Sequence, residues 1–234
     1  MYFSRVISKI ISKIKGENFQ LDDNIPFGYL IRIVLFKRVL MFIRGVIKFM
    51  RITPSIFIDS KCKIICKNKI YFNGVVTFDR NSYVDALSKK GITFGQNISI
   101  GMNTTIICSG TMKDIGEGLI VGNNVGLGTH CFYGCAGGIE IGDDTIFGNF
   151  ISLHSENHNY KDESTLIRNQ GVNRKGIKIG KNCWIGSKAT ILDGVIIKDG
   201  CINAAGALVT EGIYDENSIY AGVPAKFIKK RFLK

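Results

Sequence analysis

Two of the three histidines lie in one polar segment, which runs from residue 153 to residue 175. His154 and His158 are four residues apart, with Glu156 between them. An imidazole changes charge near neutral pH, so it can take a proton from a hydroxyl group during a reaction. A carboxylate such as Glu156 can orient an imidazole through a hydrogen bond. This segment is therefore the first candidate for a catalytic element.

A metal site is the alternative use of these residue types. Only one further histidine, His130, is present, and the paired cysteines Cys62/Cys66 and Cys131/Cys135 have a C-x3-C spacing that is not the usual one for zinc. We therefore expect no metal. The seven cysteines are expected to be small, buried side chains with free thiols, which fits a reducing cytosol.

The scaffold is indicated by a six-residue repeat between residues 176 and 209. A helix would repeat near 3.6 residues and a half-buried strand at 2, so this period predicts a parallel β-helix with coils of roughly 18 residues. The repeat is interrupted once, by Asn203. The aliphatic positions are Ile179, Ile185, Ile191, Ile197 and Val209.

The first 52 residues are predicted to be a basic amphipathic helical segment. Residues 27–52 are apolar enough to suggest a membrane span, but cations spread through them argue against it. One reading is a helix in the membrane interface, with its basic face toward acidic headgroups. The other is a cap whose apolar face packs on the end of the β-helix. The proposed basic face comprises Lys37, Arg44, Lys48 and Arg51.

A net charge of +12 implies an anionic partner, such as nucleic acid, acidic lipid or a phosphorylated ligand. Nucleic acid is disfavoured because no helix-turn-helix or RNA-binding motif is present. No signal-peptide pattern is found. We therefore expect a cytoplasmic protein, with peripheral contact at the inner face of the plasma membrane as an option.

Four segments together resemble a known family. The stretches SENHNYKDES, IKIGKNCWIGSKATILDGV, AAGALVT and SIYAGVPAKFIKKR are similar to those of hexapeptide-repeat acyltransferases. The resemblance covers roughly residues 92–231. Within the family, the chain looks most like the branch that contains sugar O-acetyltransferases and xenobiotic acetyltransferases. It implies a left-handed parallel β-helix that forms a homotrimer, with acetyl-CoA bound between subunits.

This resemblance sets the expected organisation of the chain. A left-handed β-helix is expected over residues 53–213, with the catalytic loop at residues 153–175. Residues 214–234 are expected to form a return segment and a short basic C-terminal helix.

The resemblance also assigns roles to individual residues. His158 matches the family's general base, with His154 as its rival. Trp184 matches a residue that borders the pantetheine arm of the cofactor. Ser187 matches a position near the thioester, where its hydroxyl or amide could donate to an oxyanion.

Further positions match the rest of the cofactor site. Ala205 and Thr210 match residues whose backbone groups bind pantetheine. Relatives often carry a lysine after this threonine, whereas this chain has Glu211, so Lys226 and Arg231 are the candidates to bind the phosphates instead. Asn203 is either a hydrogen-bonded core residue or part of the cofactor channel.

The acceptor side is less defined. His130, His154, Asn157 and Tyr160 are weak candidates for substrate contacts. The expected function is acetyl transfer from acetyl-CoA to a hydroxyl of a sugar, such as a lipid-linked glycan precursor of capsule or O-antigen. The alternatives are N-acetylation of an amino sugar nucleotide, acetylation of a xenobiotic, or a non-catalytic β-helix scaffold.

Overall fold

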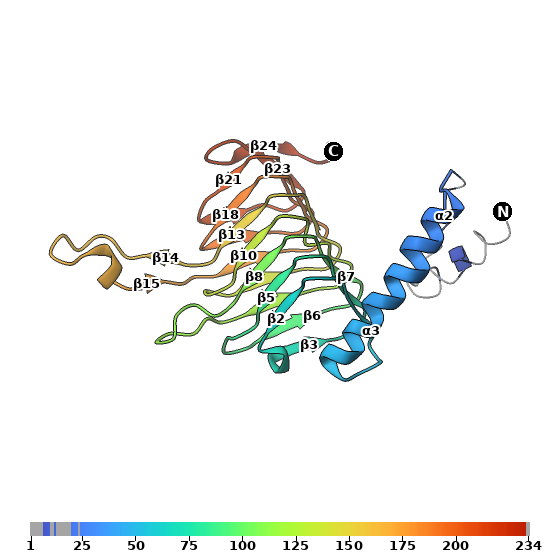
Figure 1. The fold of residues 1–234 in the computed structure, drawn as a ribbon. Coiled ribbons are helices and arrows are strands. Elements are labelled where there is room, and N and C mark those ends of the chain that lie inside the picture. Colours follow the sequence, from blue (N-terminus) through green and yellow to red (C-terminus); the bar gives the residue numbers. More distant parts are fainter. Residues whose placement is uncertain (1–6, 10–11, 13–19, 23, 233–234) are drawn as a thin grey trace.

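The chain folds as a three-sided parallel β-helix with a long helix at one end (Figure 1). The computed structural model describes residues 7–9, 12, 20–22 and 24–232. Strands pair in parallel with the equivalent strands of the coils above and below, so three faces enclose one apolar core. This architecture confirms the fold that the six-residue repeat predicts.

Each face of the prism is a ladder of short strands from successive coils. The first face contains β1 (Ile56–Ile58), β4 (Val76–Phe78), β7 (Ile98–Ile100), β12 (Ile146–Phe147), β17 (Trp184–Ile185), β20 (Ile202–Asn203), β23 (Ser218–Ala221) and β24 (Lys226–Lys230). The second contains β2 (Lys63–Ile65), β5 (Tyr83–Asp85), β8 (Thr105–Ile107), β10 (Phe132–Gly134), β13 (Ser152–His154), β18 (Thr190–Leu192) and β21 (Leu208–Val209). The third contains β3 (Ile70–Phe72), which follows the short 3-10 helix η2 (Lys67–Lys69), then β6 (Ile92–Phe94), β9 (Leu119–Val121), β11 (Ile139–Ile141), β16 (Ile177–Ile179), β19 (Val195–Ile197) and β22 (Gly212–Tyr214).

The six-residue repeat puts equivalent side chains in register. Ile179 pairs with Ile197, and Ile191 pairs with Val209 one coil later. All four are buried, and full burial of one aliphatic side chain is worth about 1.5–3 kcal/mol. The close stacking explains the glycines that follow Ile179 and Ile185, because a Cβ on Gly186 would lie 2.4 Å from a backbone nitrogen of the next coil.

Polar residues form the turns at the corners. Asn97, Asn124 and Asp144 have φ angles of 57°, 56° and 58°, a left-handed conformation that asparagine and aspartate tolerate better than most residues. Their side chains form a ladder, in which Asn97 donates to Asn124 at 3.2 Å and Asn124 donates to Asp144 at 2.9 Å.

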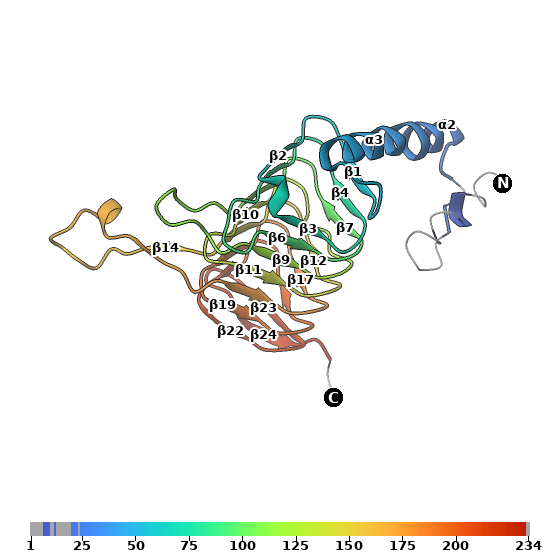
Figure 2. The same ribbon diagram turned by 90° about the horizontal axis from the view of Figure 1, so that it is seen from below.

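A continuous helix covers the first coil (Figure 2). It comprises α2 (Phe27–Leu30), the π-helical turn η1 (Ile31–Lys37) and α3 (Arg38–Phe49). A Cβ on Gly45 would lie 1.8 Å from the carbonyl oxygen of Ile56, so only glycine permits this approach. Met41 is 2% exposed on the same side. The helix therefore caps the open end of the solenoid, as one of the two readings predicts.

The basic residues of this helix are not all directed to solvent. Lys37 forms an ion pair with Asp59 at 2.9 Å, and Arg44 lies 3.9 Å from the same carboxylate. Burial would raise the pKa of Asp59, but the hydrogen bond from Lys37, together with weaker favourable contacts, lowers it overall. Two cations expected to face headgroups thus attach the helix to the first coil.

The predicted helix over residues 3–15 lies mostly outside the described residues. Within the described part of the chain, no helix has the length and apolarity that would let it cross a membrane.

The C-terminal segment differs from its prediction. In place of a basic helix, residues 226–230 form β24, which pairs antiparallel with β23. The last coil leaves unpaired backbone groups along its edge, and an added strand satisfies them where a helix could not. The basic residues of the tail therefore lie along a strand on the first face.

Candidate active site

The polar segment forms an arm that projects from the prism (Figure 1). The arm begins later than the predicted loop, because Leu153 and His154 still belong to β13. Its stem is an antiparallel pair in which β14 (Asn157–His158) is aligned with β15 (Val172–Asn173). His158 is exposed on this stem, opposite Val172.

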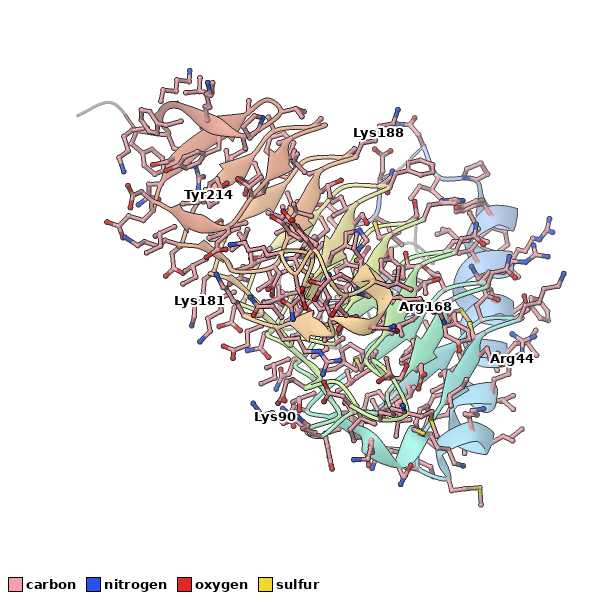
Figure 3. The ribbon with its side chains drawn as sticks, turned by 90° about the vertical axis from the view of Figure 1, so that its left-hand side faces the viewer. Arg44, Lys90, Arg168, Lys181, Lys188 and Tyr214 are labelled. Atoms are coloured by element: carbon pink, nitrogen blue, oxygen red, sulfur yellow. The ribbon has the colours of Figure 1, made fainter. Side chains whose placement is uncertain are left out.

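Internal hydrogen bonds hold the tip of the arm. The side chain of Gln170 donates to the carbonyl oxygens of Asp162 and Thr165, at 2.8 and 2.6 Å, and its side-chain oxygen accepts from the Asp162 amide. The short helix η3 (Ile167–Asn169) lies at this tip. Figure 3 views the prism from the arm's side, with Arg168 of η3 at the centre. The arm is thus an ordered hairpin. Tyr160, which is 68% exposed, lies between stem and tip.

Arg174 attaches the base of the arm to the prism. Its side chain is 12% exposed and contacts the carboxylates of Glu156 at 2.9 Å and of Asp114 at 2.8 Å. Glu156 is therefore engaged by Arg174, not by an imidazole, so the option that it orients His158 is not realised in this chain. Sequence reasoning missed Arg174 and Asp114, because the pair is 60 residues apart and no motif links them.

His154 has a different environment from His158. It ends β13, forms a 2.5 Å hydrogen bond with the Ser152 hydroxyl, and packs against the ring of Phe132 at 5.4 Å between centroids. Burial lowers the pKa of His154 below its ordinary value of 6.5, which favours the neutral ring. This ring is fixed on the second face, whereas His158 projects from the arm.

His130 is a corner residue. Its φ is 56°, its ring bonds the side chain of Asn103 at 2.8 Å, and it stacks on Phe150 at 4.9 Å. These contacts continue a polar ladder from Asn81 through Asn103. They make His130 part of this corner ladder.

Trp184 points outward from the first face, as its place before the inward Ile185 predicts, and it is 53% exposed. Ala205 is also exposed, at the corner after β20. Beside it, a Cβ on Gly206 would meet no atom within 4 Å. Ala205 and Gly206 thus leave an open stretch of backbone at this corner that an extended ligand such as pantetheine could approach.

Ser187 and Thr210, two further residues predicted to contact the cofactor, already form hydrogen bonds within the chain. The Ser187 hydroxyl oxygen accepts a 3.2 Å hydrogen bond from the Asn149 amide, and its own proton is left to donate elsewhere. The carbonyl oxygen of Thr210 accepts from the Tyr214 hydroxyl at 2.9 Å. The next residue, Glu211, pairs with Lys175 at 2.5 Å.

The two tail cations differ. Lys226 is exposed on β24. Arg231 donates to the carbonyl oxygen of Gly200 at 2.8 Å, which ties the tail to the last coils. Lys226 is therefore the freer of the two to bind a phosphate.

Asn203 is fully buried in the aliphatic stack. Both polar atoms of its side chain lack a hydrogen-bond partner among the described residues. It is therefore neither a hydrogen-bonded core residue nor, in this single chain, a residue that lines an open channel.

One chain does not bring all these residues together. The arm leaves the prism between β13 on the second face and β16 on the third, whereas Trp184 lies on the first face. Figures 1 and 2 show the arm pointing away from the first face. A single chain therefore carries His158 and Trp184 on different sides of the prism.

The cysteines match their prediction except that Cys62 and Cys66 are half-buried. All seven are free thiols, and five are buried. Burial raises the pKa of the Cys201 thiol to about 12, which makes it unreactive. Among the described residues no group of histidine, cysteine and acidic side chains could hold a metal ion.

Comparisons with known proteins decide the family. A family model, the hexapeptide repeat of succinyl-transferase, matches residues 176–211. A Staphylococcus aureus protein named as an acetyltransferase is 30% identical over 172 residues, which cover 73% of this chain and 79% of the relative. This chain belongs to the hexapeptide-repeat acetyltransferases. The β-helix is therefore the left-handed one of that family.

Other similar proteins extend over different lengths. WbbJ of Escherichia coli, whose name places it in lipopolysaccharide biosynthesis as an O-acetyl transferase, is 28% identical over 147 residues, 59% of this chain and 71% of WbbJ. This chain spans only 45% of an acetyltransferase-named Mycobacterium tuberculosis protein, with 29% identity. A structure of a mutant of AntD, an N-acyltransferase from Bacillus cereus, in complex with dTDP and coenzyme A has a TM-score of 0.53 and 19% identity. It covers 75% of this chain and 80% of AntD and shares the fold.

Proposed function

We propose that this hexapeptide-repeat acetyltransferase moves an acetyl group from acetyl-CoA to a hydroxyl group of a sugar in surface polysaccharide biosynthesis. The observation that carries the proposal is His158, an exposed imidazole held on an ordered arm at the family's base position. The relation to WbbJ supports a sugar hydroxyl as the acceptor.

The chemistry follows from the residues. The acceptor hydroxyl must lose its proton as its oxygen attacks the thioester carbon, and His158 takes that proton. The Ser187 hydroxyl donates to the carbonyl oxygen as negative charge develops there. The proton returns to the departing thiolate of coenzyme A, so no covalent acyl-enzyme is required.

The cofactor side is proposed to lie along the first face. Trp184 borders the pantetheine arm, and the open backbone beside Ala205 and Gly206 supports its close approach. Lys226 is proposed to contact the phosphates. Because His158 lies away from this face, we place the active site between two subunits of a homotrimer.

The test is release of free thiol from acetyl-CoA with a panel of acceptors. The panel contains neutral sugars, lipid-linked saccharides and amino sugar nucleotides. Thiol release with a neutral or lipid-linked sugar, giving a product that alkaline hydroxylamine cleaves, would identify an ester and support O-acetylation. A product that resists hydroxylamine, formed only with the amino sugars, would mean N-acetylation and would overturn the proposal.

A further inference from the structure

The helix that caps the solenoid leaves an apolar stripe exposed on its outer side. Capping uses the inner side, where Met41 and Gly45 are buried against the first coil. The stripe members follow spacings of three and four residues, so they share one side of the helix. They are Phe36, Leu40, Ile43, Ile47 and Met50, which are 66%, 50%, 46%, 69% and 82% exposed.

The stripe is a continuous apolar surface. From Phe36 to Met50 it runs along roughly 20 Å of helix, at a rise of 1.5 Å per residue. Val39, at 51% exposure, widens it. Single exposed apolar residues are ordinary on protein surfaces, but a contiguous patch of this kind marks a site of interaction.

The charges around the stripe select its partner. Residues 25–58 contain six lysines and arginines and no acidic residue. Arg44 and Lys48 lie along the same edge of the helix. Arg44 is 3.9 Å from Asp59, but its side chain is still 43% exposed, and Figure 3 shows it at the outer margin of the molecule. The side chain of Lys67 adds a cation at the end of the helix, where it donates to the Lys48 carbonyl oxygen at 2.7 Å.

A second copy of this chain fits this surface poorly. Packing two such helices stripe against stripe would bring Arg44 and Lys48 close to the same cations of the other copy, without a carboxylate on either helix to offset them. An anionic bilayer offers both requirements, because its acyl region takes the apolar side chains and its headgroups take the cations.

We propose that the outer stripe of this helix inserts into the surface of a bilayer that contains anionic lipid. The helix then lies in the plane of the membrane, because it lacks the length and apolarity to cross it. Its inner side remains on the β-helix, so the same helix caps the solenoid and holds it at the lipid surface. This inference stands independently of the proposed acetyl transfer.

The experiment is co-sedimentation of the full-length protein with vesicles. One set contains phosphatidylcholine alone and the other contains phosphatidylcholine with phosphatidylglycerol. We expect binding to the anionic vesicles to be at least about tenfold stronger, and to weaken as salt is raised. The double variant Ile43→Asn/Ile47→Asn should bind at least about tenfold more weakly than wild type.

The matched control is Met112→Asn, which removes a 90%-exposed apolar side chain from a surface loop and should leave vesicle binding unchanged. Circular dichroism confirms that each variant is folded, and the salt dependence of wild type needs no variant. No binding, or equal binding to neutral vesicles, would overturn the proposal. It would also fail if the double variant binds as wild type does, or if it only changes the oligomeric state.

Discussion

At the residue scale, the two histidines of the polar segment have separate environments. Both rings are exposed, but His154 is held on the prism by Ser152 and Phe132, whereas His158 lies on the arm. The ring of His154 is already hydrogen-bonded to Ser152, and this favours His158 as the base. The contact between His154 and the sheet makes it a structural residue whose protonation is linked to folding.

That linkage gives a pH prediction. Because the pKa of His154 is lowered, the folded protein binds fewer protons than the unfolded chain just below pH 6.5. The neutral ring therefore contributes stability above about pH 6.5, and the contribution is lost as the pH falls. Urea denaturation from about pH 7.5 to about pH 5 should show a steeper loss of stability for wild type than for His154→Gln. Identical slopes would contradict the assignment.

Asn203 gives a prediction about stability. Its buried side chain has no hydrogen-bond partner among the described residues, so it is desolvated without compensation. Asn203→Val restores the aliphatic repeat and should raise the free energy of unfolding by about 1–3 kcal/mol. Denaturant titration measures the change.

Asn124→Val is the contrasting control for this variant. That asparagine has a left-handed corner conformation and hydrogen bonds on both sides, so its replacement should destabilise the fold. If Asn203→Val also destabilises, Asn203 has a partner in the folded protein.

At the element scale, the repeat predicted the β-helix because each buried position requires the same residue type in every coil. The C-terminal strand was not predictable in this way. The segment KFIKKR has no hexapeptide pattern, and its structure depends on the open edge of β23, which is a tertiary feature. The sequence left open whether the apolar residues of the N-terminal helix pack on the β-helix or face a membrane, because an apolar pattern does not identify the surface that covers it.

Individual residues of the candidate site could be predicted from the sequence, but the contacts between them could not. The resemblance indicated His158 and Trp184, and the alternation of the strand correctly turned Trp184 outward. The contact between Arg174, Glu156 and Asp114 joins two insertions through space, and residue spacing carries no signal for it.

The Arg174 contact predicts how the arm is held. Arg174→Met should free the base of the arm and leave two carboxylates without their cation. Amide exchange over residues 156–173 should become faster by about tenfold or more, while the melting temperature changes little because the prism does not depend on the arm. Arg168→Met, at the exposed tip, is the control and should leave exchange at the stem unchanged. Unchanged exchange in Arg174→Met would show that the β14–β15 pairing alone orders the arm.

At the scale of the whole molecule, the separation of the arm from the first face predicts complementation between subunits. His158→Ala and Trp184→Ala homo-oligomers should each be nearly inactive. When the two variants are co-expressed, about a quarter of the sites combine an intact arm with an intact first face, if mixing in a trimer is random. The purified mixture should recover activity in that proportion. Mixtures as inactive as the parents would mean that each site forms within one chain.

The central claim is that His158 is the base for transfer from acetyl-CoA, and its most direct test is turnover of acetyl-CoA by His158→Ala with the best hydroxyl acceptor. We predict that kcat falls by about 10²-fold or more, while the Kd for coenzyme A is unchanged, because the first face is intact. His130→Asn, which keeps a residue suited to the left-handed corner, should retain wild-type kcat. A His158→Ala enzyme that turns over at the wild-type rate would contradict the account and make His154 the next candidate for the base.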